Sequence, residues 1–224
     1  MSRLERVPGA GKRGWPRAAG VAFGLAILWG AAAPVRAYEH RQDTPSVGVQ
    51  IQYGDLEYDS EWGKTFGWGR GVSVHLRQSI ARNRAIGLSF EQQRFEREIP
   101  VNENAADSEC LGKADYFDWQ ALLLDYYVYF RRPLRRCYYA VASVGFYRPQ
   151  LVDEMKTSGQ QQIPGVCYPS ENLLGRLGVG MEYFVSRKFS FDASVSGYYI
   201  RVSHQSGLTA SAQFALGVHL YATR

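Results

Sequence analysis

Apolar and polar residues alternate with a period of two in eight stretches of the chain. The last of them, 208–222, has an apolar residue at every second position: Ala210, Ala212, Phe214, Leu216, Val218, Leu220 and Ala222. The other seven are 47–53, 72–77, 86–91, 120–130, 138–146, 176–183 and 189–196, of which 138–146 is ambiguous because both of its faces are largely apolar. A period of two is typical of half-buried β-strands, so we predict eight strands.

The segments between these strands alternate between long and short. Loops are expected at 55–67, 95–118 and 149–172, tight or short turns at 79–84, 131–136 and 186–188, and a modest last loop at 202–207. An even number of strands, with short turns at one end and long loops at the other, is typical of outer-membrane barrels. We therefore predict an all-β protein, an eight-stranded antiparallel up-and-down transmembrane β-barrel that occupies 46–224, with the last strand closing on the first near 47–53.

Alternation alone does not say which face points inward, because a soluble lipocalin-like barrel alternates in the same way around an apolar ligand. A water-facing sheet surface carries many lysines, yet no predicted strand contains one, and the polar face consists mainly of Gly, Ser and Gln. Such residues suit the crowded lumen of a small barrel. The same face carries charged residues and histidines that we expect to form a paired lumen network centred on two arginines: Arg77, Glu91, Asp125, Arg176, Glu182, Asp192, His75 and His219.

The apolar face is then expected to contact lipid. Its aromatic residues fall near strand ends, as the two aromatic girdles of a membrane barrel do. Those placed toward the long-loop end are Tyr53, Trp68, Phe146 and Tyr199, and those toward the short-turn end are Phe130, Tyr138 and Phe189.

The N-terminal segment accounts for the formal charge of +5. Residues 1–37 combine a basic start, a short apolar run and small residues before Tyr38, which predicts a cleaved secretory signal peptide followed by a short lead, 38–45. Six of the 26 basic residues and one of the 21 acidic residues lie in this segment, so the remainder is formally neutral. A nucleic-acid partner is therefore not expected.

Three cysteines remain after an export signal, which permits disulfides. Cys110 and Cys167 fall in the two longest loops on one side of the barrel, so a disulfide between them is expected, whereas Cys137 falls at the opposite end and is expected to be a thiol. No Cys-x-x-Cys pair occurs, and no metal site or cofactor is expected.

In strand number and loop pattern, 46–222 resembles the small eight-stranded outer-membrane barrels of the OmpA/OmpX type. The resemblance implies a porin-like fold in the outer membrane of a Gram-negative bacterium, with extracellular long loops. It also implies contact with outer-membrane lipid, lipopolysaccharide and the barrel-assembly machinery. Such barrels usually end in an aromatic residue, whereas this chain ends HLYATR, with Tyr221 three residues from the end. Envelope structure, adhesion or another surface interaction is the expected role, with the surface ligand unassigned.

Two other functions stay open. The pair His204-x-Ser206 is similar to the His-x-Ser element of lipid A 3-O-deacylases and would place a base beside a nucleophile. The residue after the serine is Gly207 rather than the asparagine of that family, and no acidic residue follows it, so we expect no enzymatic activity. A soluble periplasmic lipid-binding barrel is the other alternative. The arginines of 131–136 and 82–84 are expected to be solvated, with contact to lipid phosphates as the alternative.

Overall fold

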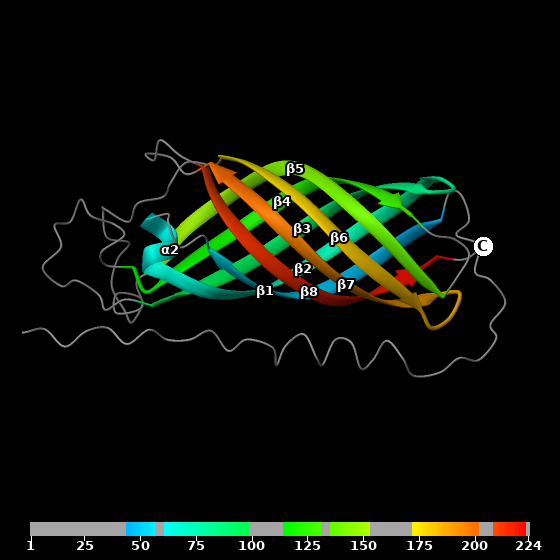
Figure 1. Ribbon diagram of the computed structural model, residues 1–224, viewed down its shortest axis with the longest axis horizontal. Helices are drawn as coiled ribbons and strands as arrows, with labels where there is room; N and C mark the ends of the chain where they lie inside the picture. Colours follow the sequence, from blue (N-terminus) through cyan, green and yellow to red (C-terminus); the bar gives the residue numbers. More distant parts are fainter. Residues whose placement is uncertain are drawn as a thin grey trace, which may run out of the picture. The chain divides into compact units, whose positions relative to one another are not determined.

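The alternating stretches form eight antiparallel strands that close into a barrel, as Figure 1 shows. The coordinates are a computed structural model, which describes residues 44–56, 61–98, 114–130, 135–152, 172–201 and 208–222. The strands are β1 (Pro45–Leu56), β2 (Phe66–Ala81), β3 (Arg84–Arg97), β4 (Tyr116–Tyr129), β5 (Arg136–Val152), β6 (Asn172–Phe184), β7 (Phe189–Arg201) and β8 (Leu208–Tyr221). A short helix, α2 (Glu61–Thr65), directly precedes β2. The predicted fold class is confirmed.

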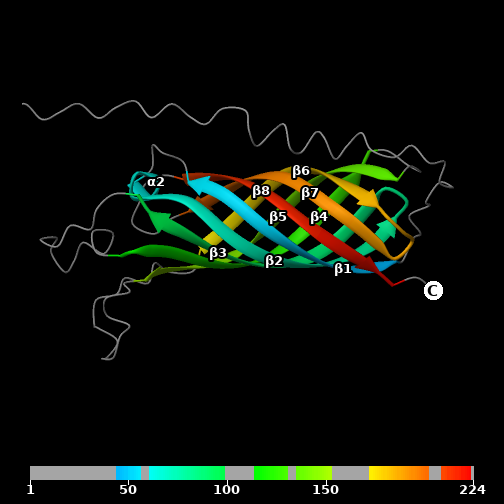
Figure 2. The same cartoon turned by 90° about the horizontal axis from the view of Figure 1, so that it is seen from below.

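The barrel closes through a ladder between its first and last strands. The register of β1 and β8 runs from Ser46 opposite Tyr221 to Leu56 opposite Ser211, and the two strands lie side by side in Figure 2. Each strand also pairs with its neighbour in sequence, so none of the eight has an unpaired edge over its central length. Closure of this kind satisfies the backbone hydrogen bonds that lipid cannot provide.

The polar face of every strand points into the barrel, and the apolar face points out. On β8, Phe214 and Leu216 are exposed, whereas Gln213 and His219 are buried. The ambiguous stretch in β5 follows the same rule, because the polar positions of its neighbours fix the inward parity. The exposed aromatic residues near the two ends of the barrel are Tyr53, Trp68, Phe146, Tyr199, Phe130 and Tyr138, whereas Phe189 is half-buried. Among the described residues, no helix combines the length and hydropathy that a membrane-spanning helix requires.

Several strands extend further at the long-loop end than the alternation predicts. β3 continues to Arg97, and β4 already begins at Tyr116. The prediction that β5 ends before Pro149 is wrong, since β5 continues to Val152. Among the described residues, β5 pairs with β6 only as far as Tyr147, so the described partner of β5 at Pro149 is β4. A proline, which has no N–H to donate, is tolerated at such an edge.

Candidate functional site

The eight lumen residues predicted from the sequence are all buried inside the barrel. Each is at most 5% exposed: His75, Arg77, Glu91, Asp125, Arg176, Glu182, Asp192 and His219. Because they come from β2, β3, β4, β6, β7 and β8, the barrel closure is what brings them together. They form two clusters of the same composition, each with one arginine, two carboxylates and one histidine.

The first cluster is centred on Arg176 and contains Glu91, Asp125 and His75; we call it the Arg176 cluster. The guanidinium of Arg176, on β6, crosses the lumen to bind Glu91 on β3 through Nη1 and Asp125 on β4 through Nη2, the latter at 2.6 Å. Its Nε donates to Ser143 Oγ at 3.1 Å, and the hydroxyl of Tyr198 donates to Glu91 at 2.9 Å. Ser89 Oγ donates to Asp125, so both carboxylates receive a hydroxyl hydrogen bond in addition to the shared cation, as buried charges require.

The second cluster is centred on Arg77 and contains Glu182, Asp192 and His219; we call it the Arg77 cluster. Arg77 Nη1 lies 3.8 Å from Glu182 and Nη2 lies 3.6 Å from Asp192, so these ion pairs are looser than those of Arg176. The guanidinium stacks instead on an aromatic face, with its Cζ 4.2 Å from the ring centroid of Tyr127. Cation–π contact of this kind stabilises a desolvated guanidinium.

Hydroxyl and amide donors complete the second cluster. The hydroxyl of Tyr139 donates to both oxygens of Asp192 at 2.9 Å, and Gln50 Nε2 donates to Asp192 at 2.7 Å. Ser190 and Tyr221 donate to Glu182. The two carboxylates are thus held mainly by neutral donors, and the arginine supplies the opposite charge.

The two clusters are in contact through Tyr127 and through the histidine pair. The hydroxyl of Tyr127 donates to Asp125 at 3.2 Å, while its ring supports Arg77. The rings of His75 and His219 lie 6.2 Å apart between their centroids. The eight residues thus lie in two linked clusters in which each arginine is shared by two carboxylates.

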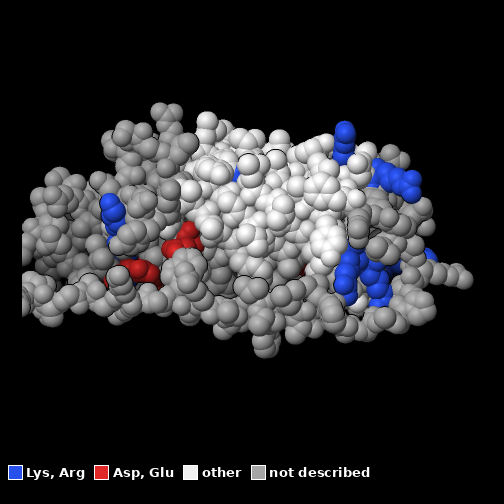
Figure 3. Space-filling model, viewed as in Figure 1, with Lys and Arg blue, Asp and Glu red and all other residues white. Residues whose placement is uncertain are grey.

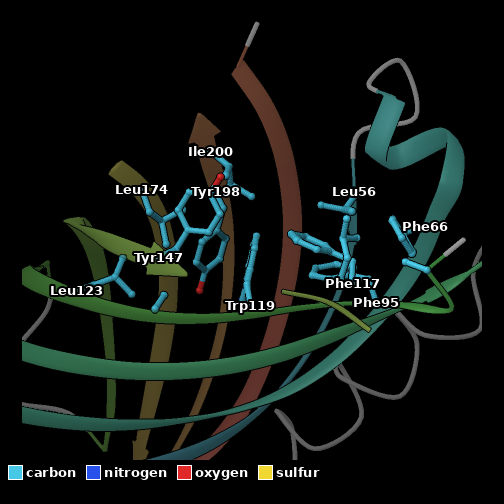
Figure 4. Packing of buried hydrophobic residues seen from close by; sticks show 13 residues of the cluster. Leu56, Phe66, Phe95, Phe117, Trp119, Leu123, Tyr147, Leu174, Tyr198 and Ile200 are labelled. Carbon is cyan, nitrogen blue, oxygen red and sulfur yellow. The ribbon is translucent and has the colours of Figure 1, made fainter. Parts of the chain in front are cut away.

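Two clusters of buried apolar and aromatic side chains pack inside the barrel, one toward each end. At the long-loop end, the packed residues shown in Figure 4 include Leu56, Phe66, Phe95, Phe117, Trp119, Leu123, Tyr147, Leu174, Tyr198 and Ile200. The cluster at the short-turn end consists of Ala85, Tyr127, Tyr129, Cys137, Tyr139, Val141, Phe184 and Tyr221. These clusters were not predicted from the sequence. One feature of the sequence could have indicated them: Trp119, Ala121 and Leu123 lie at every second position along β4 with Asp125, so they share the face that was assigned to the lumen.

Glycines on the lumen face make room for two of the large inward side chains. A Cβ at Gly48 would lie 2.1 Å from the His219 ring, and one at Gly180 would lie 2.4 Å from the Tyr139 ring. Both distances are far below a van der Waals contact, so a larger residue at either place would displace the ring. The small residues of the polar face are thus complementary to the rings opposite them.

One group of lumen residues has the composition of an acyl-transfer triad. Ser73 Oγ lies 2.8 Å from His75 Nε2, and His75 Nδ1 lies 3.9 Å from Asp125, with Ser89 Oγ 2.8 Å from the same Nδ1. All four side chains are buried, at most 2% exposed, and Asp125 already binds Arg176. A nucleophile enclosed in this way cannot meet a lipid substrate, so the geometry favours a structural role.

Several predicted residues lie outside the described part of the chain. They are the catalytic alternative His204 and Ser206, the disulfide candidates Cys110 and Cys167, the signal peptide 1–37, and 38–43 of the lead. Their roles remain predictions. Cys137 lies buried in β5, in the aromatic cluster of the short-turn end. Within the described ranges, no group of three or more His, Cys, Asp or Glu side chains is arranged to hold a metal ion.

Comparison with known proteins identifies the fold. No family model and no curated protein matches the chain by sequence. Neisserial surface protein A aligns at 13% identity with a TM-score of 0.57, over 79% of this chain and 96% of that one. The outer membrane protein OprG of Pseudomonas aeruginosa aligns at 10% identity with a TM-score of 0.57, over 84% and 100%. The outer membrane protein AlkL aligns at 13% identity with a TM-score of 0.50, over 87% and 97%. The chain has the fold of the small eight-stranded outer-membrane β-barrels.

Proposed function

We propose that this chain is a non-enzymatic protein of the Gram-negative outer membrane, with a filled polar lumen and a role at the cell surface or in the envelope. The observation that carries the proposal is the distribution of polarity across the barrel wall. Leu88, Leu124 and Val144 are adjacent on three strands and about half exposed, whereas Glu91 and Asp125, the charged residues in the middle of β3 and β4, are buried. Hydrocarbon outside and paired charges inside are what a lipid-embedded barrel requires.

The same distribution argues against a soluble lipid carrier. Such a barrel would enclose its ligand with the apolar face and present the polar face to water. Here the interior holds the Arg176 and Arg77 clusters, and the exterior presents a continuous apolar surface much larger than the patches of soluble monomers. The inward-facing carboxylates would be unfavourable neighbours for an acyl chain.

We further propose that the long connections after β1, β3 and β5 face the outside of the cell. Loops on a rigid scaffold are where specific binding usually resides. The proposed surroundings of the barrel are outer-membrane lipid and lipopolysaccharide, and the barrel-assembly machinery is the proposed insertion partner. A lipid A hydrolase would require His204 and Ser206, and no observation on the described residues favours it.

The first test is heat-modifiable migration. Protein extracted from membranes with detergent is expected to run as a compact species when unboiled and to shift to its full apparent mass after boiling. The reason is that a closed, fully hydrogen-bonded barrel resists dodecyl sulfate until heated. Release from cells by salt alone, without detergent, would contradict the membrane location.

The second test concerns conduction. In a planar bilayer, the purified barrel is expected to show no stable open-channel current, because Trp119, Arg176 and Tyr127 occupy successive levels of the lumen. A 16-stranded porin in the same bilayer is the positive control, since barrels of that size leave an aqueous channel. Steady single-channel currents from this protein, comparable to those of the porin, would show that the lumen is open.

A further inference from the structure

The end of the barrel that carries the short turns is covered by cations. The turns joining β2 to β3, β4 to β5 and β6 to β7 all lie at this end. Each contributes two described basic residues, namely Arg82 and Arg84, Arg135 and Arg136, and Arg187 and Lys188. Arg82, Arg84, Arg187 and Lys188 are exposed, and the other two are half-buried. Figure 3 shows blue side chains gathered at the end of the barrel opposite α2. We call these six residues the cationic ring.

The three turn segments that carry the cationic ring contain no acidic residue, since the sequence has none in 79–90, 126–152 or 183–191. Glu182 and Asp192, which come just before and after the last of these segments, point into the lumen and are buried. Over the described residues, positive charge is therefore concentrated on this end of the barrel.

The opposite end of the barrel carries mixed charges. Arg70 pairs with Glu96 at 3.3 Å, and Arg94 forms two hydrogen bonds to Asp118 at 2.8 and 2.7 Å. In the view of Figure 3, red side chains lie toward the α2 end, and a mostly white band separates them from the blue side chains at the other end. Among the described residues, the two ends thus differ in charge composition, with cations alone in the short turns and both signs at the α2 end.

The cationic ring lies directly next to the exposed apolar residues of the barrel's outer face. On β3, Arg84 is followed two residues later by the exposed Ile86, and on β5 Arg136 is followed by the exposed Tyr138. A residue one step outside the hydrocarbon and next to an interfacial aromatic lies at the level of lipid headgroups. A guanidinium at that level can bind a phosphate through two parallel hydrogen bonds.

We propose that the cationic ring binds the anionic phospholipid headgroups of the leaflet that the short turns face. The proposal rests on the membrane location argued above, under which this leaflet is the phospholipid leaflet on the periplasmic side. Phosphatidylglycerol is the representative headgroup, since it combines a phosphodiester with a net negative charge. Attraction between a polybasic surface and an anionic leaflet acts over about one Debye length, so it is expected to be sensitive to salt.

The test compares two triple variants that remove the same charge from opposite ends of the barrel. In the first, Arg82→Gln, Arg187→Gln and Lys188→Gln neutralise exposed members of the cationic ring. In the second, the matched control, Lys64→Gln, Arg70→Gln and Arg148→Gln neutralise exposed cations at the α2 end. Each full-length protein is reconstituted into phosphatidylcholine vesicles that contain trace spin-labelled phosphatidylglycerol or spin-labelled phosphatidylcholine. The fraction of motionally restricted label gives the selectivity of the barrel for the anionic lipid.

The unmodified barrel is expected to prefer phosphatidylglycerol in 0.1 M salt and to lose this preference in 1 M salt, where the Debye length is about 3 Å. The ring variant is expected to lose most of the preference, since one cation near an anionic surface changes binding by up to about fivefold. The control is expected to keep it.

Other results would overturn the inference in distinguishable ways. Equal selectivity of the two variants, or no preference in the unmodified protein at either salt concentration, would show that the ring does not bind phospholipid. Salt-sensitive cosedimentation with peptidoglycan sacculi, in place of lipid selectivity, would assign the ring to a polymer. Failure of the unmodified protein to enter any vesicle would instead contradict the membrane location. The salt comparison needs no variant and therefore remains valid if the ring variant does not fold.

Discussion

Arg176→Met is expected to lower the free energy of unfolding of the barrel by about 3–5 kcal/mol, because it leaves two buried carboxylates without their counter-charge. Glu91 and Asp125 are each at most 1% exposed, and Arg176 is the cation that both of them bind directly. A loss of this size is a large part of the 5–15 kcal/mol that typically separates a folded domain from its unfolded chain. The measurement is a reversible urea titration of the protein in lipid vesicles.

A charge-compensated variant separates the ion pair from the loss of packing. Combining Arg176→Met with Glu91→Gln and Asp125→Asn removes the whole charged group, and this triple variant is expected to recover most of the lost stability. Ser89 and Tyr198, which donate to the carboxylates, can still donate to the amide oxygens. If Arg176→Met alone lowers stability by less than about 1 kcal/mol, water reaches the carboxylates and the lumen is not filled as described.

The eight strands and the inward position of the charged residues could be predicted because both depend only on a period of two. Once one polar residue of a strand is assigned to the lumen, parity assigns all the others. Arg77 and Arg176 were therefore expected in the lumen from the sequence. Closure of β8 on β1 was expected because a spanning sheet cannot leave an edge in lipid.

The partners of the two arginines could not be predicted in the same way. Arg176 lies on β6 and binds Glu91 on β3, whereas Arg77 on β2 faces Glu182 on β6. Which charges meet across the lumen depends on the stagger and tilt of the strands, and alternation contains neither. The sequence therefore supports a single network around both arginines, and the structure divides it into two linked clusters.

The aromatic filling was missed because the inward face of β4 contains both kinds of residue. Trp119 and Leu123 share this face with Asp125, so an apolar residue there does not signal the lipid side. Leu122 and Leu124, on the opposite face, are exposed. In a strand with large apolar residues on both faces, only the neighbouring strands decide which set packs inside.

The orientation of the apolar face leads to the second large effect, which is expected for Leu124→Arg. Leu124 is 57% exposed and lies between Leu88 on β3 and Val144 on β5, far from the described cations at either end. An arginine at the middle of the lipid face destabilises a barrel by about 2–4 kcal/mol, because its charge must leave water. We expect a loss of that size in urea titrations of vesicle-embedded protein.

Gln120→Arg is the matched control, since Gln120 lies on the same strand and the same face as Leu124. It is four residues nearer to the long-loop end, roughly 13 Å along the strand, and its register neighbours are Gln92 and Arg148. At that level an arginine reaches the interface, where the expected loss is about 0–1 kcal/mol. If water instead of lipid surrounded the observed barrel, both positions would face water, so both variants would change stability by less than about 0.5 kcal/mol. The depth dependence of the loss therefore distinguishes a lipid-embedded wall from a water-facing one, and equal small effects at the two positions would reject the proposed membrane location.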